Sequence, residues 1–367
     1  ELQDAPIIVK IKKTDITNGV EVIGASLQIK DKNGKVIEEW VSDGSEHIIQ
    51  AKLKAGETYI LHEEGAPNGY YYTEDIEFKI PLKDEGIIKV EMKDAPTDVK
   101  IHKTDVTTGE EVPGAHLQLK DSHGDLIDEW ISTTKPHEFK AELIAGQTYY
   151  LYETGAPDGY YYEEVVEFKI PLKDEGIVEV KMEDKPTIYE FTKTDITDKK
   201  EIPGAKLQIK DKEGNIIEEW ISGTEPHKIV GKLIAGETYI LHEEGTPNGY
   251  YYAEDIEFKI PLKDEGIKKV EMQDAPTIVH IKKTDITTGK EIPGAKLQIK
   301  DKNGNVIEEW ISTEEAHVIT AKLVAGEKYI LHEEGAPDGY VYAEDIEFRI
   351  PLKDEGIIKV EMQDAPT

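Results

Sequence analysis

Residues 271–285 read EMQDAPTIVHIKKTD, and this stretch recurs with few changes at residues 1–15, 91–105 and 181–195. A shortened copy, EMQDAPT, stands at residues 361–367. In each full copy an Asp is followed two residues later by a Pro, and a Lys comes seven residues after that Pro. The stretch recurs with a fixed period of 90 residues. A period this long predicts tandem domains rather than a solenoid of small units.

The recurring stretch also predicts the domain boundaries, because each copy ends one unit and begins the next. We place four domains at residues 5–97, 98–187, 188–277 and 278–367, and we assign residues 1–4 to the tail of a preceding repeat. We therefore expect the sequence to be an excerpt of a longer chain. The joints are short, contain a Pro and lack a Gly/Ser tract. Such joints are stiff compared with flexible linkers, so we expect a rod of four domains.

Composition excludes several classes of partner and of stabilisation. The 367 residues include 76 acidic and 44 basic side chains, which gives a net charge of −32. This charge argues against binding to nucleic acid or to anionic membranes. There is no cysteine, so no disulfide supports the modest core of a 90-residue domain. No stretch is apolar for long enough to cross a bilayer, and no signal peptide begins the chain.

Within a repeat, apolar and polar residues alternate in short runs separated by turn-forming residues, and no helical period is present. This pattern predicts an all-β, Ig-like β-sandwich domain of about seven strands. The Lys-Asn-Gly-Asn sequence at 302–305 is a hairpin signal between two of these runs. In the fourth repeat we expect strands at residues 279–283, 295–301, 306–312, 317–323, 328–334, 342–352 and 357–364.

Three ionisable residues per repeat fall on the apolar face of their strands, since strand residues two apart share a face. Lys283 continues the face of Ile281, Glu333 continues the face of Leu331, and Asp364 lies on the inward face of the last strand. The equivalent residues are Lys13, Glu63 and Asp94 in the first repeat, Lys103, Glu153 and Asp184 in the second, and Lys193, Glu243 and Asp274 in the third. Each domain is therefore expected to point one Lys, one Glu and one Asp into its core.

Two interpretations of this set remain open. Because burying ions without partners is costly, the three groups could form a buried or half-buried ion cluster. Alternatively, burial lowers the pKa of a Lys and raises that of a carboxylic acid, by as much as ~3–5 units. A neutral amine beside a protonated Asp is a nucleophile beside an electrophile, and the Glu could carry protons between them. The product would be a Lys–Asp amide, formed with loss of water.

The sequence also resembles a known family. The motifs are KTD at 283–285, GAKLQIKD at 294–301, EEGAPDGY at 333–340, and a closing strand that ends in Asp364 before Pro366. Together they are similar to the CnaB-type, transthyretin-like (prealbumin-like) domains of surface adhesins and pilins of Gram-positive bacteria. All four repeats carry the pattern. The resemblance implies four tandem β-sandwich domains of this type.

In that family the Lys of the first strand forms an intramolecular isopeptide bond with an Asn or Asp of the last strand, and the Glu before the A-P-x-G-Y loop promotes it. Asn is the commoner partner, so water rather than ammonia would leave here. The resemblance implies that Glu63, Glu153, Glu243 and Glu333 promote the cross-links Lys13–Asp94, Lys103–Asp184, Lys193–Asp274 and Lys283–Asp364.

We therefore expect a structural stalk on the cell wall of a Gram-positive bacterium, with the anchor and signal outside this sequence. Its partners would be further repeats and an adhesive domain of the same parent chain. The alternative is that the repeats themselves bind a host extracellular protein. We expect a monomer without cofactor or metal, and no enzyme, because the chemistry consumes its own residues in a single turnover.

Other features have plainer explanations. The turn at Asp301, Asn303 and Asn305 suggests a calcium loop, but a hairpin turn explains it better. The tyrosines at 70–72, 160–162 and 250–252 could bind a ligand, although such aromatics more often cover a sandwich edge. The histidines beside the Glu are replaced by a Tyr in the second repeat, which argues against a metal or acid–base role. They are His62, His242 and His332, and the replacement is Tyr152. The tryptophans Trp40, Trp130, Trp220 and Trp310 are interpreted as packing residues.

Overall fold

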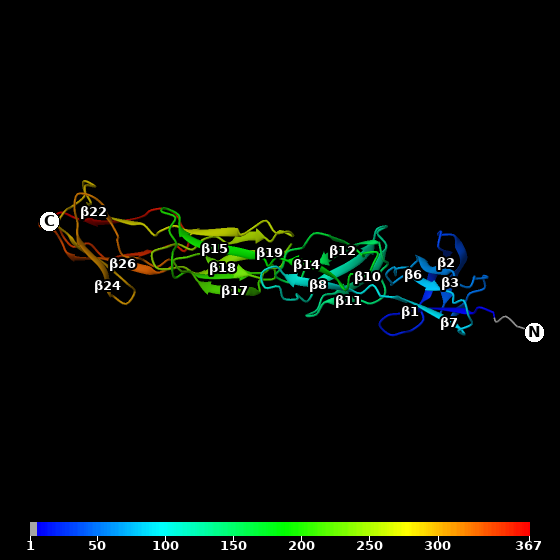
Figure 1. The fold of residues 1–367 in the computed structure, drawn as a ribbon. Helices are drawn as coiled ribbons and strands as arrows, with labels where there is room; N and C mark the ends of the chain where they lie inside the picture. The colour runs from blue at the N-terminus through cyan, green and yellow to red at the C-terminus, as the bar shows by residue number, and fades with distance from the viewer. Residues whose placement is uncertain (1–5) are drawn as a thin grey trace, which may run out of the picture. The chain divides into compact units, whose positions relative to one another are not determined.

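A computed structural model describes residues 6–367 (Figure 1). Contacts divide the chain into two compact units, one ending at Pro186 and the other spanning Thr187–Thr367, and each unit contains two repeats. All regular elements in the described residues are strands, and each repeat forms two sheets. The predicted all-β class with four repeated sandwiches is therefore confirmed. The predicted tail at residues 1–4 lies outside the described residues.

The first repeat shows the topology that the others follow. One sheet has the strand order β4-β1-β7 and the facing sheet has the order β3-β2-β5-β6. The strands are β1 (Val9–Asp15), β2 (Ile23–Asp31), β3 (Val36–Asp43), β4 (His47–Ile48), β5 (Thr58–Gly65), β6 (Ile76–Lys79) and β7 (Ile88–Asp94). Successive inward side chains from both sheets meet in the core, as in other sandwiches.

The remaining repeats use the same seven strands and the same two sheets. The second repeat contains β8 (Val99–Asp105), β9 (His116–Asp121), β10 (Leu126–Ile131), β11 (His137–Phe139), β12 (Thr148–Gly155), β13 (Val166–Lys169) and β14 (Val178–Asp184). The third contains β15 (Ile188–Asp195), β16 (Lys206–Lys210), β17 (Ile216–Ile221), β18 (His227–Val230), β19 (Thr238–Gly245), β20 (Ile256–Lys259) and β21 (Lys268–Asp274). The fourth contains β22 (Val279–Asp285), β23 (Lys296–Lys300), β24 (Val306–Ile311), β25 (His317–Val318), β26 (Lys328–Gly335), β27 (Ile346–Arg349) and β28 (Ile358–Asp364).

The first and last strands of each repeat lie side by side and run parallel. In the first repeat Lys13 is in register with Met92, and Asp15 with Asp94. Because the first and last strands of a repeat run in the same direction, the chain enters the sandwich at one end and leaves it at the other. They also place the Lys of the first strand next to the end of the last strand.

Two predicted strands of the fourth repeat are too long. The strand expected at 342–352 is only Ile346–Arg349, and the strand expected at 317–323 is only His317–Val318. Before β27 the chain forms no ladder, because the N–H of Ala343 donates to a side-chain oxygen of Glu333 instead. After β25 the chain turns into the sandwich, where Leu323 is buried. Alternating side chains in these segments reflect packing rather than strand pairing.

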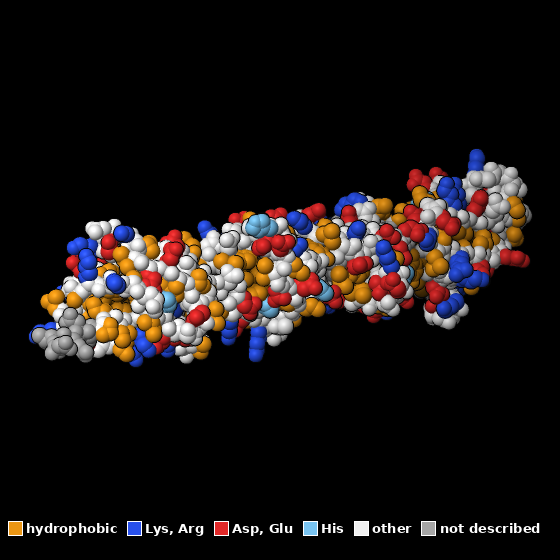
Figure 2. Space-filling view, turned by 90° about the vertical axis from the view of Figure 1, so that its right-hand side faces the viewer, with side chains coloured by type: hydrophobic (Ala, Val, Ile, Leu, Met, Phe, Trp, Pro, Cys, Tyr) orange, Lys and Arg blue, Asp and Glu red, His pale blue; other side chains and the backbone are white. Residues whose placement is uncertain are grey.

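The core and the surface follow the binary pattern of the sequence. In the first repeat Ile11, Leu27, Ile29, Leu61 and Met92 are at most 2% exposed. Burying such a side chain contributes about 1.5–3 kcal/mol. Acidic, basic and apolar side chains are interspersed over the face drawn in Figure 2. Each Trp lies flat on a His of the neighbouring sheet, as Trp40 does on His47 with ring centroids 4.2 Å apart, which agrees with a packing role.

Candidate isopeptide sites

In the first repeat, three strands bring the predicted Lys, Glu and Asp together inside the sandwich. Lys13 lies on β1 and Asp94 on β7 of the same sheet, while Glu63 reaches across from β5 of the facing sheet. The Nζ atom of Lys13 contacts Oδ1 of Asp94 and lies 2.9 Å from Oε1 of Glu63. The three residues are 2%, 0% and 4% exposed. A polar group so deeply buried is costly unless its partners are present, and here the partners are one another.

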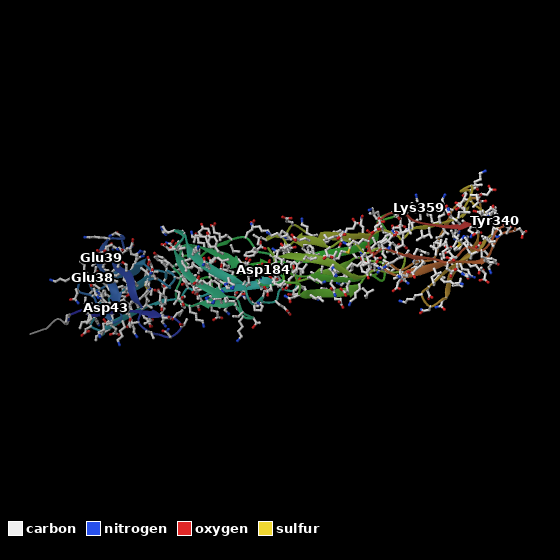
Figure 3. The ribbon with its side chains drawn as sticks, turned by 180° about the vertical axis from the view of Figure 1, so that it is seen from behind. Glu38, Glu39, Asp43, Asp184, Tyr340 and Lys359 are labelled. Carbon is white, nitrogen blue, oxygen red and sulfur yellow. The ribbon has the colours of Figure 1, made fainter. Side chains whose placement is uncertain are left out.

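The same triad occurs in all four repeats, so all twelve predicted residues are brought together in sets of three. The Lys Nζ to Glu Oε1 distance is 2.9 Å in the second repeat and 3.0 Å in the third and fourth. In each repeat the Lys Nζ also contacts Oδ1 of the Asp. Figure 3 labels Asp184, the member of the second triad that ends β14. The Lys and Asp of each set are separated by 81 residues in sequence.

A backbone N–H that the sequence did not indicate orients each Glu. Oε2 of Glu63 accepts a hydrogen bond from the N–H of Thr73 at 2.9 Å. The equivalent donors are the N–H groups of Glu163, Ala253 and Ala343, each at 2.8 Å. The donor comes from the irregular segment before β6 or its equivalent, ten residues after the Glu. With Oε2 held in this way, Oε1 is directed at the Lys.

Burial shifts four acids of these sites toward their protonated forms. Burial raises the pKa of Asp184 and of Asp274 to about 7; the neighbouring Lys opposes this rise and the neighbouring Glu adds to it. Burial likewise raises the pKa of Asp364. In the first repeat, burial raises the pKa of Glu63 against the effect of Lys13. One cation between two carboxyl groups leaves the triad neutral only when one of those groups holds a proton.

This arrangement is suited to amide formation. A neutral Lys amine can attack the carboxyl carbon of the contacting Asp, and the Glu can accept a proton from nitrogen and return one to the leaving hydroxyl. A C–N bond forms, a C–O bond breaks and one water leaves. Because the three groups are already in contact, orientation costs little. The same geometry without reaction is a buried ion cluster, the second interpretation of the sequence.

A second cluster, which sequence reasoning missed, fixes the loop after the Glu strand. Oδ1 of Asp15 accepts hydrogen bonds from the N–H and the hydroxyl of Thr17, and Oδ2 accepts one from the hydroxyl of Tyr70 at 3.0 Å. Burial and this hydrogen bond raise the pKa of Tyr70 to about 12. The bond recurs as Tyr160–Asp105, Tyr250–Asp195 and Tyr340–Asp285. The signal was present in the sequence as the paired KTD and GY motifs.

The turn at Asp301 and the histidines beside the Glu residues make ordinary structural contacts. Oδ1 of Asp301 accepts the N–H groups of Asn303 and Asn305, at 2.8 and 2.9 Å, which is a hairpin-turn arrangement. His62 pairs with Asp75 on the outer face of its sheet. Over residues 6–367, no group of three or more His, Cys, Asp or Glu side chains is placed to hold a metal ion. Within the same residues, no helix is long and apolar enough to cross a membrane.

Comparison with known proteins places the repeats in one domain family. Residues 8–96, 97–186, 187–276 and 277–366 each match the family described as SpaA, prealbumin-like fold domain. No curated protein matches the sequence.

Solved structures with similar chains include two pilins and one further bacterial protein. The Bacillus anthracis TIE protein is 18% identical, with all of this chain and 76% of that one covered and a TM-score of 0.38. The shaft pilin SpaA of Lactobacillus rhamnosus GG is 14% identical, with 49% and 98% covered and a TM-score of 0.25. A streptococcal ancillary pilin is 14% identical, with 74% and 99% covered and a TM-score of 0.30.

Proposed function

The chain belongs to the SpaA family of prealbumin-like fold domains, and on that premise we propose that it is a structural stalk segment of a Gram-positive surface protein. Each repeat is cross-linked by one amide between the Lys of its first strand and the Asp of its last. The observation that carries the proposal is the contact between Lys Nζ and Asp Oδ1, beside the Glu, inside every repeat. The chemistry is a single self-directed turnover, so the chain is not an enzyme in this proposal.

The positions of the proposed bonds explain how such a segment resists force. Force that enters the first repeat through β1 reaches Lys13, passes through the side-chain amide to Asp94 and leaves through β7. Residues 14–93 then carry almost no load. From Asp94 the backbone runs only nine residues to Lys103, where the next amide takes up the force. The load path alternates short backbone pieces with amides and is covalent throughout.

The proposed setting follows from the family and the charge. A stalk holds an adhesive domain away from the cell wall, and repeats of the same sequence supply length. Further repeats and an adhesive domain in the parent chain are the partners that we propose. The net charge of −32 disfavours association between copies and fits a monomeric segment.

Intact mass is the direct test of the cross-links. Each amide expels one water, so the folded protein is expected to weigh four waters less than its sequence. Glu333→Ala removes the proton carrier of the fourth repeat and should reduce the deficit to three waters. His332→Ala changes the adjacent residue on the outer face and should leave the deficit at four. A mass equal to that of the sequence would leave only the ion cluster, and an unchanged deficit in Glu333→Ala would show that this Glu is dispensable.

A further inference from the structure

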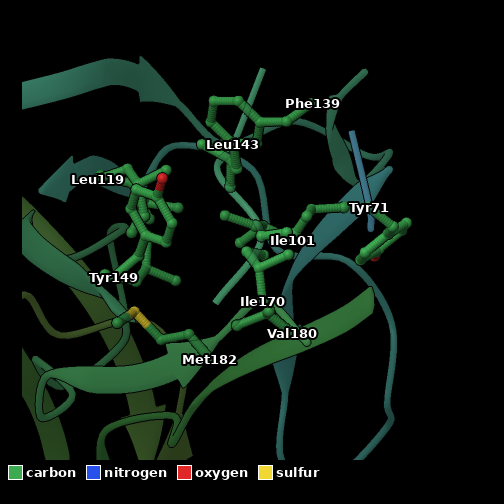
Figure 4. Close-up of a cluster of buried hydrophobic side chains, with 14 residues drawn as sticks. Tyr71, Ile101, Leu119, Phe139, Leu143, Tyr149, Ile170, Val180 and Met182 are labelled. Atoms are coloured by element: carbon green, nitrogen blue, oxygen red, sulfur yellow. The ribbon is translucent and has the colours of Figure 1, made fainter. Parts of the chain in front are cut away.

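One tyrosine of the first repeat belongs to the core of the second. Tyr71 is 1% exposed and packs in a cluster with Ile101, Leu143, Ile170 and Val180, all from the second repeat (Figure 4). It follows the Gly-Tyr sequence of the loop after β5. We call Tyr71 and its equivalents the plug, and the end of the sandwich that receives a plug the socket.

Backbone contacts hold the first plug in its socket. The N–H of Tyr72 donates to the carbonyl of Leu172 at 3.0 Å, and the side chain of Glu74 pairs with Lys173 at 2.9 Å. Gly69 approaches the second repeat so closely that an added Cβ would lie 2.0 Å from the carbonyl oxygen of Ala141. Since φ at Gly69 is +88°, glycine is required here for both space and conformation.

The second unit repeats this arrangement independently. Tyr251 of the third repeat is 1% exposed and packs into the core cluster of the fourth. The N–H of Tyr252 donates to the carbonyl of Leu352 at 3.0 Å, and Glu254 pairs with Lys353. The same position in the preceding repeat therefore fills the same socket in both units.

The first repeat contains the same socket, and within residues 6–367 no tyrosine plug fills it. A hollow of about 440 Å³ is lined by Pro6, Ala55, Ile80, Leu82, Asp84 and Ile88, among others. Four of these residues, Ala55, Ile80, Leu82 and Asp84, have equivalents 90 residues later that line the filled socket of the second repeat. These equivalents are Ala145, Ile170, Leu172 and Asp174, of which Ala145 and Ile170 belong to the Tyr71 cluster. Burial raises the pKa of Tyr71, and the charge of Asp174, the equivalent of Asp84, adds to this rise.

Equivalent apolar side chains are more exposed in the empty socket of the first repeat than in the filled sockets. Ala55 is exposed, whereas Ala145 and Ala325 are 9% and 8% exposed. The side chain of Leu82 is 81% exposed, compared with 57% for Leu172. Leaving this much apolar surface open at the end of a small core is unfavourable, and covering it recovers about 25 cal/mol per Å².

We propose that the socket of the first repeat binds the tyrosine plug of another repeat of this type, placed immediately before it in the same polypeptide. Residues 1–6, ELQDAP, match the segment that joins the other plugs to their sockets, EMKDAP and EMQDAP. Lys83 stands where Lys173 and Lys353 bind the Glu of the incoming loop. After this segment, Ile7 stands where residues 97 and 277 are Thr, so the first repeat offers an apolar side chain in place of a hydroxyl.

The fourth repeat of a second copy is not a candidate to fill the socket of the first repeat, because it lacks the tyrosine plug. It has Val341 where the other repeats have Tyr, and Val341 and Tyr342 are 48% and 64% exposed. A second copy of the chain therefore presents no tyrosine plug at its last repeat. The proposal is independent of the isopeptide bonds, because plug and socket make only noncovalent contacts.

A single-cysteine reporter tests the proposal, since the natural chain has no cysteine. Ala55→Cys should react quickly with a maleimide in the four-repeat chain, whereas Ala145→Cys, beneath Tyr71, should react slowly. A fifth repeat is then fused by placing residues 188–273 directly before Asp4, which recreates the natural joint. In this chain the labelling of Ala55→Cys should slow by about tenfold or more.

The matched control replaces the tyrosine of the added repeat by the natural residue of the fourth, Tyr251→Val within that copy only. Labelling of Ala55→Cys should then return to the fast rate. Two results would overturn the proposal: unchanged fast labelling in the five-repeat chain, or slow labelling that persists with Val. Circular dichroism of the fused chain verifies that the added repeat is folded. The mass deficit of the original four repeats is unaffected by either result, so this test and that of the cross-links fail separately.

Discussion

The first and fourth repeats bury the same three ionisable side chains but surround them differently. In the first repeat the residue that donates its N–H to the Glu is Thr73, whose hydroxyl also lies 2.6 Å from Oδ1 of Asp94. In the fourth repeat the same N–H comes from Ala343, which has no hydroxyl. The contacts of Lys, Glu and Asp are nevertheless alike in both. The site therefore depends on a backbone donor, and the side chain at that position is free to vary.

The two repeats also differ at the plug. Tyr71 is 1% exposed because a following repeat receives it, whereas Val341 is 48% exposed. Within each repeat, the triad comes from three paired strands that are held by the sheet ladders. The plug lies on an irregular loop whose surroundings depend on the neighbouring repeat. The triad is thus the same in all four repeats, while the plug position is Tyr in the first three repeats and Val in the fourth.

The largest expected effect comes from removing one proposed cross-link. Lys283→Ala opens a loop of 81 residues, whose closure is worth roughly 4–5 kcal/mol by the chain-entropy model. That is comparable with the whole stability of a small domain, so the fourth repeat should melt well below the others in calorimetry. In single-molecule pulling, the variant should show one unfolding step of about 270 Å, and the natural chain none.

Lys282→Ala is the matched control for that variant. Lys282 points to the other face of the same strand and pairs at the surface with Glu291 at 3.5 Å. Exposed pairs of this kind contribute about 0–1 kcal/mol, so its melting and pulling traces should match those of the natural chain. If Lys283 were a buried cation and not an amide, its loss would also destabilise the repeat, so melting alone does not separate the two cases and the pulling trace is decisive. Four long steps in the natural chain would contradict the cross-linked stalk.

Much of this architecture follows from alternation in the sequence. Because Lys283, Glu333 and Asp364 continue apolar faces at a spacing of two, their burial could be predicted without a structure. Their mutual contact required the additional knowledge that the first and last strands pair. The expectation of a strand over 342–352 was wrong at its start, because the N–H of Ala343 bonds to the side chain of Glu333 and not to a neighbouring strand.

Two features could not be predicted from the sequence: the backbone donor that orients each Glu, and the packing of a tyrosine into the neighbouring repeat. The N–H of Ala343 that orients Glu333 belongs to a segment with no strand partner, and hydrophobic periodicity carries no information about such donors. Tyr71 was interpreted as a possible ligand strip or as cover for a sandwich edge. Alternation shows that a side chain is apolar and faces inward, but not that the interior which receives it belongs to the next domain.

A smaller effect is expected from pH in a repeat that cannot cross-link. In Lys103→Met, Asp184 remains a free carboxyl. Burial raises its pKa from 3.8 in the unfolded chain to about 7 beside Lys103, and loss of the opposing lysine raises the pKa of the folded state further. The folded repeat then binds more protons than the unfolded one between these values. Its stability should fall as pH rises from about 4 through about 7, by about 1.4 kcal/mol per unit of pKa difference.

The natural second repeat should lack this dependence, since in the proposed cross-link Asp184 is part of an amide that does not titrate. Lys181→Met removes an exposed lysine from the last strand and serves as the control. The quantity to measure is the melting temperature of the second repeat between pH 4 and 8, taken as the difference from the control. Equal pH dependence in Lys103→Met and in the control would show that Asp184 does not carry the proton assigned to it.

The smallest expected effect comes from removing the Thr73 hydroxyl, which the first repeat has and the fourth repeat lacks. Thr73→Val keeps the shape of the side chain and the N–H that binds Glu63, but it removes the hydroxyl that can donate to Oδ1 of Asp94 or to the carbonyl of Lys93. A hydrogen bond of this kind contributes about 0.5–1.5 kcal/mol, so hydrogen exchange of the first repeat should quicken by roughly three- to tenfold.

The reciprocal change, Ala343→Thr, places a hydroxyl near Asp364 and should slow exchange in the fourth repeat by a similar factor. Neither change should alter the mass deficit, because the backbone donor to the Glu is retained in both. If Thr73→Val lowered the deficit by one water, the side chain at this position would be part of the reaction, and the backbone N–H would be insufficient to hold the Glu. If both variants exchanged like the natural chain, the hydroxyl would contribute nothing to the site, and the two repeats would be energetically equivalent around their triads.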